Sequence, residues 1–257
     1  MKCSVTGNKK LCPGFHHISL TPQSPLGPIA PGQFVMIRCS GGVDPLLRRP
    51  MSVAESAPDG SSFGLIVQVA GRGTQALAGL ARGDQLDVIG PFGSGFNVPG
   101  EAREIMIVAG GTGVAPFLGL APGLTAKGKS VHVLLGARTA GLLLMEDRFF
   151  SSGAQVHLAT EDGSRGFDGL VSALMEEQLD HMEDPPDIAL TCGPAGMMRA
   201  VAAIAERNNI PCQASLENRM ACGFGACLGC VTHVRGESKY VTVCHKGPVF
   251  DTRQVEI

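Results

Sequence analysis

The chain has no strong excess of charge of either sign. It contains 21 Lys and Arg residues against 23 Asp and Glu residues, a formal net charge of −2. A net charge so close to zero creates no long-range field that would attract nucleic acid or an anionic membrane surface. We therefore expect neither nucleic acid nor a membrane as a partner, and we expect partners to be recognised through local contacts.

We also expect no targeting or membrane segment. No apolar core of a secretory signal follows Met1, and Pro13-Gly14 come soon after the basic pair Lys9-Lys10. The uncharged stretch 105–124 is long enough to span a bilayer, but five glycines and two prolines interrupt it. These features predict a cytoplasmic protein.

Cysteine, in contrast, is plentiful, with nine residues. In the cytosol disulfides are rare, and clustered thiols more often bind metal or undergo redox chemistry. Cys222, Cys227 and Cys230 have four and then two residues between them, and Cys244 follows after 13 more. This is the plant-type ferredoxin spacing, which predicts a 2Fe-2S cluster. Structural zinc is the alternative, but zinc sites usually pair two CxxC motifs and this segment has one.

Three regions of the chain differ in their hydrophobic pattern. Residues 1–99 contain short extended runs, such as 33–37 and 63–69, between turn-forming residues, which predicts a small antiparallel β-barrel. Residues 100–211 alternate apolar strands with helical segments, which predicts a doubly wound parallel sheet. Residues 212–257 have little core-forming periodicity and hold four cysteines, so we expect this segment to need a cofactor to fold.

Two loops are predicted at the carboxyl edge of the parallel sheet, where open α/β sheets bind ligands. They comprise Gly110, Gly111, Thr112 and Gly113 after the first strand, and Cys192, Gly193 and Pro194 after a later strand. A glycine loop that begins a helix lets phosphate approach the backbone closely. The first loop does not match GxGxxG, so its assignment to a nucleotide rests on position. The second could equally be a turn that begins a helix.

Together and in this order, the motifs resemble the ferredoxin–NADP reductase superfamily over residues 34–208. In that superfamily a flavin-binding barrel precedes a nicotinamide domain. The resemblance implies that FAD is held by an Arg-Pro-x-Ser motif, by a strand that lines the flavin and by a phosphate-binding turn. The matching residues are Arg49, Pro50, Met51 and Ser52 for the motif, Ile66, Val67 and Gln68 for the strand, and Gly73 and Thr74 for the turn. Taken alone, each of these segments is a weak signal.

The C-terminal segment carries a more specific resemblance. Residues 217–230, with Val243-Cys244 and 247–250, resemble the family of electron-transfer subunits of type 1B dihydroorotate dehydrogenase. The resemblance implies an oxidoreductase subunit with FAD, a 2Fe-2S cluster and NAD(H). Its partner would be a separate FMN-containing catalytic subunit of pyrimidine biosynthesis, in a hetero-oligomer. Two departures from the family pattern are Met51 and His245-Lys246.

An electron relay of this kind needs no catalytic triad or paired carboxylates. Nicotinamide transfers two electrons as a hydride and a 2Fe-2S cluster takes up one, so a flavin must stand between them. The choice of nicotinamide is less clear from the residues, because Arg138 could pair with a 2′-phosphate and no acidic residue directly closes the strand 131–135. The resemblance favours NAD. Glu217 and Arg219 are expected to be solvated.

The cluster segment is also expected to meet the partner. Phe224, Leu228, Val249 and Phe250 are predicted at or near the partner surface, although they could instead shield the cluster. Two other functions remain open: a relay subunit of a different complex, such as a sulfide dehydrogenase or hydrogenase diaphorase, and a zinc-stabilised binding module whose glycine loops are only turns.

Overall fold

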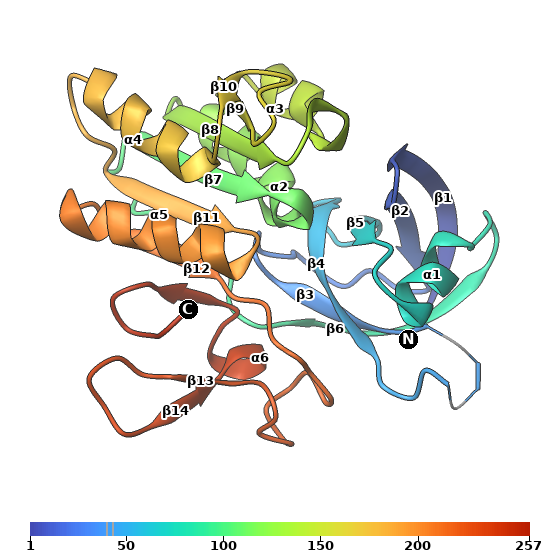
Figure 1. The fold of residues 1–257 in the computed structure, drawn as a ribbon. Coiled ribbons are helices and arrows are strands. Elements are labelled where there is room, and N and C mark those ends of the chain that lie inside the picture. The colour runs from blue at the N-terminus through green and yellow to red at the C-terminus, as the bar shows by residue number, and fades with distance from the viewer. Residues whose placement is uncertain (40, 43) are drawn as a thin grey trace.

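The N-terminal part of the computed structural model, which describes residues 1–39, 41–42 and 44–257, is a closed barrel. Its six antiparallel strands run in the order β1-β2-β5-β4-β3-β6 (Figure 1). They are β1 (Lys2–Cys12), β2 (Phe15–Pro22), β3 (Phe34–Arg38), β4 (Arg49–Ser56), β5 (Phe63–Gln68) and β6 (Gln85–Phe92), with the short helix α1 (Arg72–Ala78) before β6. Branched side chains such as Val35, Ile37 and Leu65 fill the interior. The predicted barrel is confirmed.

The middle of the chain forms a seven-stranded sheet in the order β10-β9-β8-β7-β11-β12-β15. The strands are β7 (Glu104–Gly110), β8 (Ser130–Ala137), β9 (Gln155–Thr160), β10 (Phe167–Asp168), β11 (Ile188–Cys192), β12 (Cys212–Ser215) and β15 (Val249–Asp251). All neighbours are parallel except β12 and β15. The strand order reverses direction between β7 and β11, which makes this the point where such sheets bind ligands.

Helices cover both faces of the sheet, as the doubly wound prediction requires (Figure 1). The turn η1 (Gly111–Val114) and the helices α2 (Ala115–Thr125) and α3 (Glu146–Ser151) pack with Ile105 and Ile107 of β7. The helices α4 (Val171–His181) and α5 (Ala195–Arg207) pack with Met106 and Val108 on the other face. This division follows from the alternation of side chains along a strand.

The stretch 105–124, which is uncharged, divides between β7, η1 and α2, so it is not one continuous helix. In the part of the chain that the structure describes, no helix has the length and apolar character to cross a membrane.

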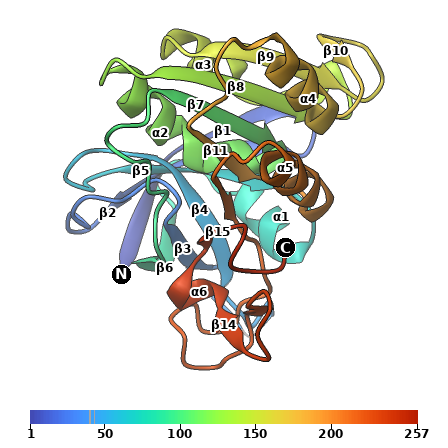
Figure 2. The same ribbon diagram turned by 90° about the vertical axis from the view of Figure 1, so that its left-hand side faces the viewer.

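The C-terminal segment adds to the sheet and then extends beyond it. β12 and β15 are its two sheet strands, and between them lie the cysteine loop, the hairpin of β13 (Val231–His233) and β14 (Tyr240–Thr242), and α6 (Val243–Lys246). Figure 2 shows the hairpin and α6 in red at the lower end of the molecule. A separate apolar cluster joins Phe34 and Met36 of the barrel to Met220, Cys230 and Cys244 of this segment.

A charged contact links the barrel to the sheet. The carboxylate of Glu55 on β4 lies 3.2 Å from the His17 Nε2 and accepts a hydrogen bond from Arg148 of α3. The close approach of His17, together with the hydrogen bond from Arg148, lowers the pKa of Glu55 to about 2, although partial burial opposes this. The contact therefore helps to hold the two domains in one arrangement.

Candidate functional site

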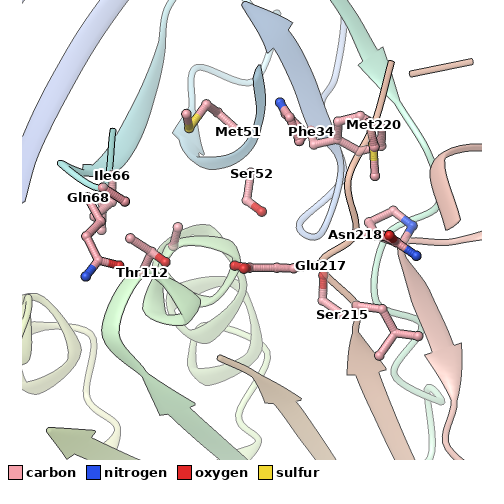
Figure 3. A pocket seen from close by; sticks show the side chains of 15 residues that line it. Phe34, Met51, Ser52, Ile66, Gln68, Thr112, Ser215, Glu217, Asn218 and Met220 are labelled. Carbon is pink, nitrogen blue, oxygen red and sulfur yellow. The ribbon is translucent and has the colours of Figure 1, made fainter. Parts of the chain in front are cut away.

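A cavity of about 240 Å³ lies where the barrel, the sheet and the C-terminal segment meet. Phe34, Met51, Ile66 and Met220 form apolar parts of its wall (Figure 3). Polar side chains line the rest: Ser52, Gln68, Thr112, Ser215, Glu217 and Asn218. Apolar walls with a few polar groups are typical of sites that hold a flat heterocycle with a polar edge. The residues present therefore fit the ring system of a flavin.

Most residues that the resemblance assigns to FAD lie at this cavity. Those that line it are Pro50, Met51, Ser52, Ile66 and Gln68. Val67 does not, because side chains alternate along β5 and its side chain packs inside the barrel. The structure thus brings β4 and β5 to one wall of the cavity.

The other three predicted FAD residues, Arg49, Gly73 and Thr74, form a second group beside the cavity. Gly73 packs against Arg49, since a Cβ atom on Gly73 would lie 3.2 Å from the Arg49 Nε. Thr74 Oγ1 accepts hydrogen bonds from the backbone N–H groups of Ala70 at 2.9 Å and Gly71 at 3.1 Å. Ala70 in turn lines the cavity. A guanidinium beside a tight glycine turn fits a phosphate group of the same cofactor.

Glu217 is exposed, as expected, but it also lines the cavity. Figure 3 shows its carboxylate reaching into the cavity between Ser52 and Thr112. Neighbouring protein removes part of the water around the carboxyl group, and this desolvation raises its pKa. The signal available in the sequence was its place just after β12, a strand whose carboxyl end meets the ligand-binding edge of the sheet.

A second cavity, of about 640 Å³, lies over the carboxyl ends of the parallel strands. Gly110, Gly111 and Pro194 line it as expected, together with Gln68, which also lines the flavin cavity. Thr112 faces the flavin cavity instead. The two cavities therefore share one side chain as a boundary. Further lining residues that the sequence analysis did not single out are Phe15, Leu142, Glu161, Leu170 and Ser172.

Gly113, Cys192 and Gly193 line neither cavity, because Gly113 packs directly against the Cys192-Gly193 backbone. A Cβ atom on Gly113 would lie 2.1 Å from the carbonyl oxygen of Cys192. Gly193 has φ of 152°, a conformation that a residue with a side chain rarely adopts. The Cys192 thiol is buried, and burial raises its pKa to about 12. These residues allow the ends of β7 and β11 to approach each other closely.

The four predicted cluster ligands come together as two pairs. The backbone N–H of Cys227 donates to the Sγ of Cys222, and the N–H of Cys244 donates to the Sγ of Cys230, both at 3.4 Å. Within the described ranges, no three His, Cys, Asp or Glu side chains converge as ligands of one metal ion. In a 2Fe-2S cluster each iron takes two of the four cysteines, whereas zinc needs four ligands around one point. The two pairs of cysteines fit this division between two irons.

Backbone N–H groups also point at the thiols of Cys222 and Cys244. Burial opposes ionisation of Cys222, but hydrogen bonds from the backbone of Cys227, Phe224 and Ala226 outweigh it and lower its pKa to about 6. The N–H of Gly225 likewise donates to the Sγ of Cys244 at 3.1 Å. Such donors stabilise thiolates and tune the potential of a cluster bound to them.

The apolar residues expected at the partner surface divide into two groups. Phe224 and Leu228 are 52% and 65% exposed, beside the exposed Cys227. Val249 and Phe250 are only 9% and 8% exposed, so the prediction that they lie at the surface is wrong. They are covered because β15 pairs with β12 and Phe250 packs against Gly247.

Comparisons with known proteins agree with this arrangement. A family model described as the iron-sulfur cluster binding domain of dihydroorotate dehydrogenase B matches residues 217–256. Another, described as an oxidoreductase NAD-binding domain, matches residues 107–203. Two similar proteins, from Desulforamulus reducens and Geobacillus kaustophilus, are named electron transfer subunits of NAD⁺-dependent dihydroorotate dehydrogenase B. They are 37% and 41% identical, and the match covers 88% of this chain and 86% of each relative.

Solved structures give the same picture of the fold. One described as an NADH-dependent reduced ferredoxin-NADP oxidoreductase, in work on flavin-based electron bifurcation, has a TM-score of 0.88 at 29% identity. The match covers 99% of this chain and 89% of that one. A ferredoxin reductase of carbazole 1,9a-dioxygenase, at 21% identity and a TM-score of 0.69, covers 82% of this chain and 66% of that one and shares the fold.

Proposed function

The chain belongs to the family of electron transfer subunits of dihydroorotate dehydrogenase B, and from this we propose that it relays electrons between NAD(H) and a partner catalytic subunit. The relay runs through FAD and a 2Fe-2S cluster to the FMN of that partner. We assign residues 1–99 to the FAD barrel, 100–211 to the NAD domain and 212–257 to the cluster segment.

The observation that carries this proposal is the contiguity of three sites. Gln68 lines both the flavin and the nucleotide cavity, so a nicotinamide and a flavin can meet there. Phe34 and Met220, which line the flavin cavity, belong to the same apolar cluster as Cys230 and Cys244. When bound, FAD supplies the exchange between a hydride and the single electrons that an iron-sulfur cluster takes up.

Each group of residues has a separate part in this proposal. Arg49, Gly73 and Thr74 hold phosphate groups of FAD, and the residues of β4 and β5 that line the smaller cavity hold its ring. Gly110, Gly111 and Pro194 hold the dinucleotide. The four cysteines bind the cluster, and no residue of this chain needs to act as a general acid or base on dihydroorotate.

The partner docks where the cluster is most accessible. Cys227 is exposed, and the side chains of Phe224 and Leu228 lie near it on the surface. Apolar and aromatic groups lose water on docking and stabilise protein interfaces. We also propose a cytoplasmic location, because the ligating thiols must stay reduced to bind iron.

Reconstitution tests the proposal. The purified full chain should contain FAD and iron, and it should reduce artificial dyes with NADH but show no orotate chemistry. Adding an FMN-containing catalytic subunit should give NAD-linked oxidation of dihydroorotate. Oxidation of dihydroorotate by this chain alone would refute the division of labour. Failure to couple with any such subunit would favour a relay in another complex, and a colourless zinc-containing protein would favour the binding module.

A further inference from the structure

The larger cavity contains a charged end that bears on the choice between NADH and NADPH. This inference rests on the proposed function, because it takes the cavity to be the dinucleotide site. Among the described residues that line it, only Arg138 and Glu161 carry charge. Both lie at the carboxyl ends of strands, Arg138 after β8 and Glu161 after β9.

The position of the flavin cavity determines which end of the dinucleotide lies at these charges. The nicotinamide ring must lie near Gln68, the residue that the two cavities share. From the Gly110 end of β7, the cavity continues past Gly136 of β8 to Glu161 beyond β9. Two strand spacings separate β7 from β9, about 10 Å. The adenosine half of the dinucleotide therefore extends toward Arg138 and Glu161.

Strand register places the two charges next to each other. Ala137 pairs with Thr160 in the parallel ladder, so Arg138 and Glu161 are the next residues on neighbouring strands. The N–H of Glu161 donates to the carbonyl of Ala137 at 3.1 Å, and the N–H of Asp162 donates to the carbonyl of Arg138 at 3.2 Å. These bonds hold both side chains at the rim of the cavity.

Neither side chain has a partner of its own in the protein. Across the ranges that the structure describes, the Arg138 guanidinium and the Glu161 carboxylate form no ion pair or side-chain hydrogen bond, with each other or with a third residue. The neighbouring acid differs, because the carboxylate of Asp162 accepts hydrogen bonds from the N–H and hydroxyl of Ser164 at 3.1 and 2.6 Å. Asp162 does not line the cavity. Glu161 is therefore the acid available to a ligand.

We propose that Glu161 makes the site selective for NADH. Its carboxylate accepts hydrogen bonds from the hydroxyl groups of the adenosine ribose, as an acidic residue after a strand does in NAD-binding sheets. A 2′-phosphate in the same place loses those bonds and meets a like charge. Once the Glu161 carboxylate is neutralised, the guanidinium of Arg138 can pair with a 2′-phosphate. The preference for NADH therefore depends on Glu161 alone.

Glu161→Gln tests the proposal in the full chain loaded with FAD and cluster. Stopped-flow measurement of flavin reduction gives kcat/KM for NADH and for NADPH. We expect the ratio of kcat/KM for NADH to kcat/KM for NADPH to fall by about 30-fold, because NADH loses a hydrogen bond to a charged group and NADPH no longer meets a like charge. The substitution should change KM for NADH more than the limiting rate, because the hydride is transferred at the far end of the cavity. Adding Arg138→Gln to this variant should remove the gain in NADPH use.

Controls separate the role of Glu161 from a general effect of charge or folding. Asp162→Asn removes the same charge one residue away and should change the ratio by less than about threefold, since a solvated charge outside the site is screened. Glu161→Asp should retain most of the preference. Calorimetric titration with ADP-ribose and with its 2′-phosphorylated form measures the same discrimination without hydride transfer.

The outcomes also distinguish this inference from the proposed function. An unchanged ratio and unchanged discrimination in Glu161→Gln, with wild-type flavin reduction by NADH, would overturn the role of Glu161 alone. A wild-type chain that holds FAD but is reduced by neither nucleotide would instead overturn the proposed function.

Discussion

Gly113→Ala is the substitution for which the structure gives the clearest expectation. The added Cβ would lie 2.1 Å from the carbonyl oxygen of Cys192, 2.4 Å from its carbon and 2.6 Å from the backbone nitrogen of Gly193. All three atoms are backbone, so no flexible side chain can move aside. The ends of β7 and β11 would have to separate by more than about 1 Å to restore normal non-bonded contact.

The cost of this separation is that of overpacking a buried contact, and we expect about 3 kcal/mol of lost stability. For a chain of this size a loss of that magnitude lowers Tm by about 6–12 °C. The effect should extend to function, because Gly111 and Thr112 of the same turn line the nucleotide and flavin cavities. NADH-dependent flavin reduction should therefore slow in the folded variant.

Thermal unfolding followed by circular dichroism is the suitable assay, since the chain contains no tryptophan for fluorescence. Gly123→Ala is the matched control, because Gly123 lies in α2 and a Cβ there would meet nothing within 4 Å. We expect that variant to be more stable by about 0.5–1 kcal/mol, from reduced freedom of the unfolded chain. A Tm for Gly113→Ala equal to that of the wild type would refute the reasoning.

Four further predictions test the remaining sites. Cys227→Ser should remove most of the iron and Cys39→Ser should not, so equal iron content in both variants would exclude the assigned ligands. Arg49→Ala should weaken FAD binding by about 10- to 100-fold through loss of a charge-assisted phosphate contact, measured by titration of the apoprotein, and unchanged affinity would mean that the motif is misread. Gly111→Val should block NADH-dependent flavin reduction, because a side chain there prevents close approach of phosphate, and an unaffected rate would count against that loop. Glu55→Gln should lower the free energy of unfolding at neutral pH. Because folding lowers the pKa of Glu55 from 4.5 to about 2, the difference in stability between variant and wild type should disappear as the pH falls through that range. A difference that stays constant with pH would contradict the assigned contacts.

The cysteine motif was predictable from sequence because its signal is local. Three of the four ligands lie within nine residues of each other, from Cys222 to Cys230. This spacing is the one that a plant-type 2Fe-2S cluster requires of its cysteines. The barrel and the parallel sheet were also predictable, since the alternation of apolar residues reports which side of each strand is buried. Both predictions of architecture are confirmed.

Residues that act through distant neighbours were harder to assign. Glu217 has the sequence context of a solvated acid, and only the packing of the barrel and the sheet around the flavin cavity shows that it also lines that cavity. Val249 and Phe250 have the composition of a surface patch beside the cluster, but pairing of β15 with β12 buries them.

The sequence by itself therefore determined the kinds of site in this protein: a thiolate cluster, a glycine loop after a strand, and an arginine motif before a turn. The tertiary structure decided how those sites are joined. Gln68 faces two cavities, and Glu161 stands beside Arg138, only because the barrel packs on the sheet and β8 pairs with β9 in one register. Such contacts depend on strand pairing and domain packing between residues far apart in the chain, which local spacing does not encode.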